Sequence, residues 1–175
     1  MKKQIVLLAI VIIATAVRGQ ENFEWKVVID SLDATKSELF DKTSQFVASN
    51  WKSAQDVVQY SDKETGTIIV KGLNKQTMKW HTVYPNWIFS YTVKFQVKDG
   101  KARIIISDVI CSDAYCGINK WPILQPTESY PKKKGFWKTN LKENEYNSLM
   151  DSLKSELQGI IDSYIEYLNY QPEEW

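Results

Sequence analysis

Residues 87–97 alternate between apolar and polar side chains more regularly than any other part of the chain. A period of two is typical of a strand with one buried face. Asp99-Gly100 follows directly and is typical of a two-residue hairpin turn, which would place Phe95 opposite Ile104 and gather the apolar side chains on one side. The polar side chains would share the other side, as in a solvated sheet face: Lys94, Gln96, Lys98, Lys101, Arg103 and Ser107.

The segment after Thr35 has apolar residues at helical spacing. Thr35 and Glu38 have the spacing of a capping box, in which each side chain accepts a backbone N–H of the other residue. Leu39, Phe40, Phe46, Val47 and Trp51 then form one apolar face. The pattern predicts an amphipathic helix that begins at Thr35 and packs on a sheet.

A second, longer helix is predicted near the end of the chain. Asn140 and Glu143 indicate its start, and apolar residues recur without a missing turn as far as Leu168. Gly159 lies inside this helix and costs about 1 kcal/mol relative to alanine. We expect that glycine to allow a close approach to the sheet.

Shorter apolar runs predict three more strands, at residues 24–30, 56–60 and 67–71, the last two joined by a turn that contains Gly66. The order is then strand, helix, four antiparallel strands, helix. Both apolar helix faces need the same sheet surface, so we expect an α+β domain over residues 20–170, an antiparallel sheet with two helices packed on one face. Residues 111–139, interrupted by three prolines, are predicted to be an irregular insertion, and residues 171–175 a tail.

The N-terminus has the pattern of a secretory signal peptide. Lys2 and Lys3 precede an apolar run over residues 5–17, and small residues suit cleavage near Ala16 or Gly19. The run is shorter than the about 20 apolar residues of a membrane-spanning helix. We expect an exported protein whose mature chain has no transmembrane segment.

Charge argues against nucleic acid as a partner. The chain has 22 basic and 21 acidic residues, and cleavage after Gly19 would remove Lys2, Lys3 and Arg18, leaving the mature chain slightly acidic. Arg103 would then be its only arginine. The basic footprint and the guanidinium contacts usual in duplex recognition are missing.

Three segments resemble a known family: SAQDVVQY at 53–60, DKETGTII at 62–69 and the strand pair 93–108 with its VKDGK turn. They are similar to the exported bacterial domains of unknown function with a TBP-like fold, the domain of unknown function 4468 family, and the likeness extends over residues 29–109. The resemblance implies a β-α-β-β-β-β-α fold and a location in the periplasm or outside a Gram-negative cell. That family has no assigned activity, so no catalytic residue is implied.

Reactive residues are few. A catalytic pair of His81 with Cys111 or Cys116 is conceivable, but no local motif supports it. A zinc site from His81, Asp113 and the two cysteines would need four converging ligands. We expect no metal and no cofactor, and a disulfide between Cys111 and Cys116 in an oxidising compartment, with two free buried cysteines as the alternative.

Aromatic and basic residues crowd the insertion, where a core stripe is not expected. Aromatic rings with a polar edge suit glycan or peptide contacts, and lysines suit anionic groups; the alternative is that the rings hold the loop onto the sheet. The candidate binding residues are Trp121, Tyr130, Lys132, Lys133, Lys134, Phe136 and Trp137.

Together these patterns favour an exported, non-enzymatic module that binds a protein, peptide or glycan in the cell envelope through residues 111–139 and the adjoining sheet. Two alternatives belong to other classes. One is a structural or assembly component of the envelope that uses an exposed edge strand or the tail as its contact. The other is an enzyme that depends on His81 and a cysteine.

Overall fold

The computed structural model describes residues 24–51, 53–77, 86–111, 121–122 and 142–170. The elements in chain order are β1 (Glu24–Ile29), α1 (Lys36–Asn50), α2 (Ala54–Val57), β2 (Val58–Asp62), β3 (Thr67–Thr77), β4 (Asn86–Lys98), β5 (Lys101–Cys111), β6 (Trp121–Pro122) and α3 (Glu143–Asn169). The main strands form one antiparallel sheet in the order β1-β5-β4-β3-β2, and β6 pairs with β5. The predicted α+β class is confirmed.

The β4–β5 hairpin has the predicted register. Phe95 pairs with Ile104, and Lys98 pairs with Lys101 across the two-residue turn. Gly100 has a φ of 70°, a left-handed conformation that costs a glycine little. Because the turn fixes the register, every second side chain lies on the same face of the sheet as far as Thr92 and Ser107. A bulge at Ser107-Asp108 then shifts the alternation of β5 by one residue, so that Val109 and Cys111 continue the buried side.

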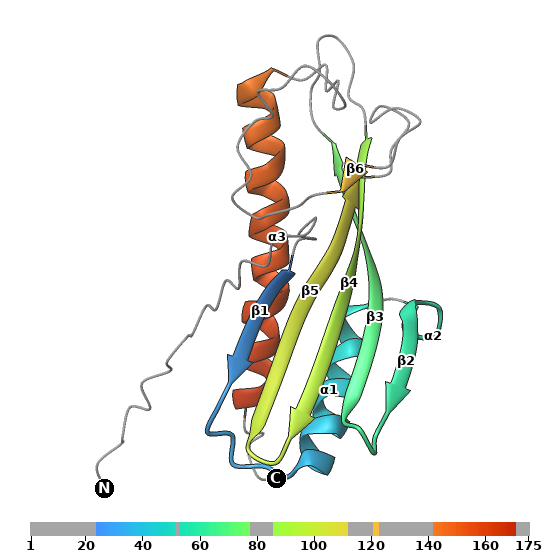
Figure 1. Cartoon of the computed structure of the whole chain (residues 1–175), viewed down its shortest axis with the longest axis vertical. Helices are drawn as coiled ribbons and strands as arrows, with labels where there is room; N and C mark the ends of the chain where they lie inside the picture. The colour runs from blue at the N-terminus through green and yellow to red at the C-terminus, as the bar shows by residue number, and fades with distance from the viewer. Residues whose placement is uncertain (1–23, 52, 78–85, 112–120, 123–141, 171–175) are drawn as a thin grey trace, which may run out of the picture.

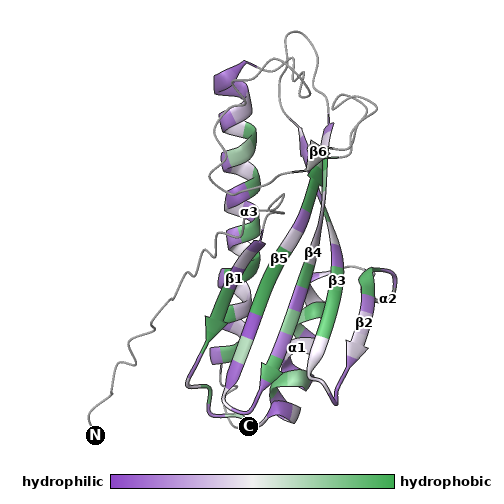
Figure 2. Cartoon of the chain, in the orientation of Figure 1, coloured by the Kyte–Doolittle hydropathy of each residue, from purple (hydrophilic) through white to green (hydrophobic). Residues whose placement is uncertain are grey.

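Both helices lie on one face of this sheet, as predicted (Figure 1). In Figure 1, α3 follows the length of the sheet, whereas α1 covers the half nearest the β4–β5 turn. We call this side the covered face. Its fully buried side chains include Ile29, Ile68, Val70, Trp87, Phe89, Val93, Phe95, Val97, Ala102, Ile104 and Ile106. Figure 2 shows the corresponding alternation of hydrophobic and hydrophilic residues along β4 and β5.

Three aromatic rings join the two helices to the sheet. The ring centroid of Phe95 in β4 lies 6.0 Å from that of Phe46 in α1 and 4.8 Å from that of Tyr164 in α3. The hydroxyl groups of Thr43 and Tyr164 are 2.9 Å apart, and Thr43 donates to the Leu39 carbonyl, so the Tyr164 hydroxyl is the donor to Thr43. This buried bond connects α1 to α3 at the centre of the core.

The helix starts differ in how well they were predicted. The capping box at α1 is confirmed, because the Glu38 carboxylate accepts the Thr35 N–H at 2.8 Å and the Thr35 hydroxyl accepts the Glu38 N–H at 3.3 Å. The predicted start of α3 is wrong: the N-cap is Lys142, whose N–H donates to the Glu145 carboxylate at 2.8 Å. Lys142 and Glu145 have the same i, i+3 spacing as the predicted pair, Asn140 and Glu143, but lie two residues later. The bond from the Lys142 N–H to the Glu145 carboxylate does not require a capping side chain at residue 142.

Three details of the strands also differ from expectation. Residues 54–57 form the short helix α2 instead of the start of a strand. Strand β3 continues to Thr77, well past the predicted end, because its ladder with β4 extends beyond the apolar run. The prolines do not exclude all regular structure from residues 111–139, since Trp121 and Pro122 form β6 at the sheet edge, where a proline is tolerated.

The two glycines inside regular elements have opposite surroundings. A Cβ added at Gly72 in β3 would lie 2.2 Å from the ring of Tyr91, its direct partner in β4. A Cβ added at Gly159 in α3 would meet nothing within 4 Å. The expected close approach at Gly159 is therefore wrong, and the glycine that permits close packing is Gly72. None of the helices in the described part of the chain is long and apolar enough to cross a membrane.

Candidate functional site

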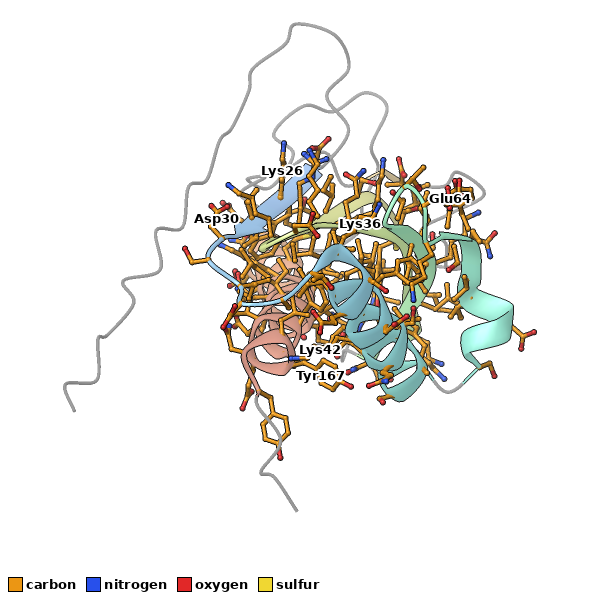
Figure 3. The ribbon with its side chains drawn as sticks, turned by 90° about the horizontal axis from the view of Figure 1, so that it is seen from below. Lys26, Asp30, Lys36, Lys42, Glu64 and Tyr167 are labelled. Atoms are coloured by element: carbon orange, nitrogen blue, oxygen red, sulfur yellow. The ribbon has the colours of Figure 1, made fainter. Side chains whose placement is uncertain are left out.

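The sheet has a second face, which points away from α1 and α3, and we call it the open face. Figure 3 shows the Lys26 side chain on this side, with the helices on the other. The strand registers place side chains in rows across all five main strands, and one such row is Lys26, Ile105, Lys94, Ile69 and Tyr60. The open face is therefore a continuous surface built from the residues that alternate with the core.

Basic side chains dominate the open face. The alternation and the registers place seven there: Lys26, Lys71, Lys75, Lys94, Lys98, Lys101 and Arg103. The acidic residues on this face are Glu24, Asp62 and Asp108, which is exposed at the β5 bulge and accepts from the Ser107 hydroxyl, with Asp30 at the rim. Among the described residues, Lys101 alone of the seven forms an ion pair, with Asp30 at 2.9 Å. The outer surface has the opposite character on α3, where six acidic residues accompany the single basic residue Lys154.

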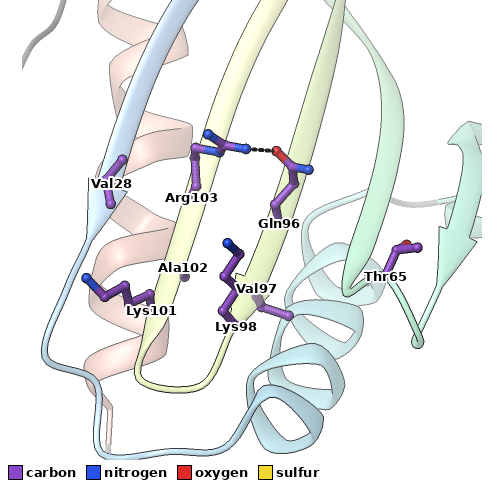
Figure 4. A pocket seen from close by; sticks show the side chains of 8 residues that line it. All are labelled: Val28, Thr65, Gln96, Val97, Lys98, Lys101, Ala102 and Arg103. Carbon is purple, nitrogen blue, oxygen red and sulfur yellow. Dashed lines mark hydrogen bonds between the residues drawn. The ribbon is translucent and has the colours of Figure 1, made fainter.

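A shallow hollow of about 190 Å³ lies at the turn end of the open face (Figure 4). Lys98, Lys101 and Arg103 line it together with Gln96, Val28 and Thr65. Val97 and Ala102 also border it, although their side chains are buried on the covered face. The Arg103 guanidinium donates a hydrogen bond to the Gln96 side-chain carbonyl. Three cationic side chains thus surround one small concavity, where any bound group would meet an excess of positive charge.

Apolar side chains lie between the cations near the β2 and β3 edge. Leu73 is 75% exposed and Tyr60 is 46% exposed. The Tyr60 hydroxyl donates to the Asp62 carboxylate at 3.0 Å. Hydrogen bonds from the Thr65 hydroxyl, from Tyr60 and from the Glu64 N–H hold the pKa of Asp62 below its usual value. These hydrogen bonds hold the Asp62 carboxylate at the β2–β3 turn.

Most of the residues that sequence reasoning proposed for binding lie outside the described residues. These are Tyr130, Lys132, Lys133, Lys134, Phe136 and Trp137, and the side chain of Trp121 is not described either. The backbone of Trp121 pairs with Cys111, which attaches that part of the segment to β5. The predicted aromatic binding surface stays a prediction.

Cys111 is fully buried at the end of β5 and is disulfide-bonded. Cys116 is the chain's only other cysteine and lies outside the described residues, as does His81. Because a catalytic cysteine acts as a free thiolate, the bonded state of Cys111 argues against its use as a nucleophile. The described residues contain no cluster of three or more His, Cys, Asp or Glu side chains placed to hold a metal ion.

Sequence reasoning described part of the open face as ordinary solvated surface and missed its extent. The β4 and β5 cations were identifiable from the hairpin, but Lys26, Lys71 and Lys75 join them only through the sheet order. The sequence of β3 indicated this, because Lys71 and Lys75 are four residues apart and therefore lie on the same face of a strand. It was missed because the predicted strand ended too early.

Comparison with known proteins agrees with the fold. Residues 25–110 match the family described as a domain of unknown function (DUF4468) with TBP-like fold. A DUF4468 family protein from Bacteroides ovatus has 9% sequence identity and a TM-score of 0.61, over 87% of this chain and 89% of that one. A TBP-like protein from Parabacteroides distasonis has 11% identity and a TM-score of 0.65, over 89% of this chain and 98% of that one.

At these identities the two structures support the fold alone, and the comparison with curated proteins gives no match. The family match adds sequence evidence, and it extends from β1 to the end of β5. The region it covers includes all five main strands and therefore the whole open face. Residues 25–110 of the chain belong to the DUF4468 family, which has a TBP-like fold.

Proposed function

We propose that the chain is an exported, non-enzymatic binding module that contacts a protein, peptide or glycan of the Gram-negative cell envelope. The contact surface in this proposal is the open face together with the adjoining residues 111–139. The observation that supports it is the uncovered sheet face with seven basic side chains, of which only Lys101 has an ion-pair partner among the described residues.

Charge distribution distinguishes this face from ordinary solvated surface. An antiparallel sheet commonly exposes one polar face, but mixed signs are usual on a surface that serves only solubility. On the open face the basic side chains outnumber the acidic ones, and a surface with such an excess attracts partners of the other sign and discriminates against like-charged ones. Exposed Leu73 adds apolar area beside Lys71 and Lys75, so the face offers both kinds of contact.

Two further features support export and a non-enzymatic role. The pattern over residues 1–19 is that of a signal peptide, and the disulfide at Cys111 is the state expected in an oxidising compartment. The same disulfide weighs against the alternative of an enzyme that uses this cysteine. We therefore propose that the protein binds a partner and does not catalyse a reaction.

The test compares two double variants that change the net charge equally. Lys71→Glu/Lys94→Glu alters the open face, whereas Lys42→Glu/Lys154→Glu alters the helix side. The mature chain and both variants are immobilised and exposed to envelope extract from the source bacterium, and the retained proteins and glycans are identified. We expect the open-face variant to lose the component retained by the wild type, with a reduction of about tenfold.

The helix-side variant should retain that component, and thermal unfolding should show both variants folded. Equal retention by all three proteins would refute recognition through the open face. Equal loss in both variants would show a dependence on net charge alone and would refute it as well. A third variant, Trp121→Ala/Trp137→Ala, reports whether residues 111–139 contribute to the same contact.

A further inference from the structure

We propose that the hollow at the β4–β5 turn is a site for one oxyanion, a carboxylate, sulfate or phosphate group presented by the ligand. This inference rests on the proposed function, because it names the chemical group that the open face recognises. The site consists of Lys98, Arg103 and Gln96, with Lys101 at its edge. Nothing in the family description assigns a ligand to it.

The cations of the hollow have an unfavourable arrangement that an anion would relieve. Lys98 and Lys101 are direct cross-strand partners on the open face, and Arg103 follows two positions later on the same side. Like charges directly opposite each other destabilise a sheet. The Lys101–Asp30 ion pair offsets part of this repulsion, and a bound oxyanion beside Lys98 and Arg103 would offset the rest.

The nearby carboxylates have other partners and do not neutralise Lys98 and Arg103. Asp30 pairs with Lys101 at the rim. Asp99, although it lies in the turn itself, accepts the Lys36 N–H at 2.7 Å and so serves the first turn of α1. Among the described residues, Lys98 and Arg103 have no carboxylate within ion-pair distance.

Arg103 is oriented by a hydrogen bond across the two strands. Its guanidinium donates to the Gln96 side-chain carbonyl, a neutral partner that fixes the position of the group without cancelling its charge. A guanidinium presents its N–H donors in a planar fork that matches an oxyanion. Figure 4 shows Arg103 and Gln96 side by side on neighbouring strands, with the Lys98 and Lys101 side chains nearer the turn.

The size of the hollow indicates what it holds. Sites for whole drug-sized ligands measure about 300–1,000 Å³, whereas this one is about 190 Å³. It therefore accommodates a single charged group or one small unit. The remainder of a larger ligand would extend over the open face toward Lys94 and Lys26, which lie in the next row of side chains.

The experiment titrates the mature chain with sulfate, inorganic phosphate or glucuronate at constant ionic strength, with chloride as the reference anion. Backbone amide shifts of residues 96–103 and calorimetry report binding. We expect saturable binding of one anion, weakened about tenfold by Arg103→Gln and by Lys98→Gln. The matched controls, Lys71→Gln and Lys75→Gln, remove the same charge outside the hollow and should change affinity by less than about twofold.

A fifth variant separates orientation from charge. Gln96→Leu keeps every cation but removes the partner of Arg103, and we expect it to weaken binding less than Arg103→Gln does. The three anions distinguish a carboxylate from a sulfate or phosphate source by their relative affinities. All variants are compared with the wild type by thermal unfolding, so that loss of binding is not loss of folding.

Two results would overturn the site. One is a shift that never saturates with any of the three anions, and the other is an equal effect of all four lysine and arginine substitutions, which indicates diffuse screening. If envelope capture still depends on Lys71 and Lys94 in that case, the proposed function stands and this inference alone fails. If that dependence is absent as well, both are wrong.

Discussion

The two faces of the sheet are made from the same strands but differ in composition and burial. Along β4, Phe95 is fully buried against both helices, whereas its neighbour Lys94 points to solvent on the open face. The covered face is mostly apolar, with Asn74 and Gln76 of β3 as buried polar exceptions, and the open face is rich in cations. Because a strand has a side-chain period of two, the packing of the covered face and the charge of the open face can vary independently in this protein.

The comparison also shows that the net charge is a poor guide here: the near-neutral balance suggested that the chain lacks a basic footprint, and that expectation is wrong for the open face. The chain's overall charge is +1, yet the open face is basic and α3 is acidic. Charge steering depends on the local field near a surface, which decays within about 10 Å at 0.1 M salt. A partner that approaches the open face therefore meets a basic protein.

The largest expected effect comes from truncation on the covered face. Phe95→Ala removes the ring that contacts Phe46 and Tyr164, and we expect a loss of about 4 kcal/mol in the free energy of unfolding. Lys94→Ala, one residue away on the open face, should change it by less than about 0.5 kcal/mol. Urea denaturation at neutral pH measures both.

Phe95→Leu accompanies this pair in case the alanine variant does not fold, and should lose about 1.5 kcal/mol. A similar loss in Phe95→Leu and Lys94→Ala would contradict the difference in burial between the faces. It would mean that the open face contributes packing as well.

Sequence reasoning succeeded where a local rule was sufficient. The hairpin register followed from residues 98–101 and a two-residue turn, and the start of α1 followed from the reciprocal bonds of Thr35 and Glu38. It failed where a neighbour decides the outcome. Strand β3 continues past Val70 because β4 supplies a ladder for it, and Gly72 is explained only by the Tyr91 ring opposite.

The candidate site illustrates the same limit. Lys98, Lys101 and Arg103 lie within one hairpin, so their proximity was readable from the sequence. The commitment of Asp99 to the first turn of α1 was not, because it joins residues 63 positions apart. The sequence order of strands also differs from their order in the sheet, so the cations of β1 could not be assigned to the same surface as those of β5.

An intermediate effect is expected at alkaline pH from two buried tyrosines of the core. Burial, with a smaller contribution from Glu156, raises the pKa of Tyr91 to about 12, and burial also raises the pKa of Tyr164. In the unfolded chain these phenols ionise near pH 10. Stability is therefore complete below about pH 10 and falls as the pH rises toward 12, because the unfolded state then binds fewer protons.

Tyr91→Phe tests this directly. We expect the variant to lose less stability than the wild type between about pH 9 and pH 11, on the order of 1 kcal/mol less, since one of the two raised groups is absent. Urea denaturation at each pH gives the comparison. Parallel pH profiles for the variant and the wild type would show that Tyr91 is accessible to solvent and that the covered face is open at this point.

The smallest expected effect is that of Gly159→Ala, which changes helix propensity without changing any contact with the covered face. Gly159 lies on the exposed side of α3, with free space where an added methyl group would lie, so Gly159→Ala should raise the free energy of unfolding by about 0.7 kcal/mol. Gly72→Ala is the matched control, because the same added methyl group meets the Tyr91 ring on the covered face and should cost about 2 kcal/mol. Chemical denaturation of both variants measures the two changes, and a loss of stability in Gly159→Ala would show that this part of α3 packs against something after all. An increase in the free energy of unfolding for Gly159→Ala and a decrease for Gly72→Ala would show that the fold requires a glycine at the packed position in the sheet and not at the exposed position in the helix.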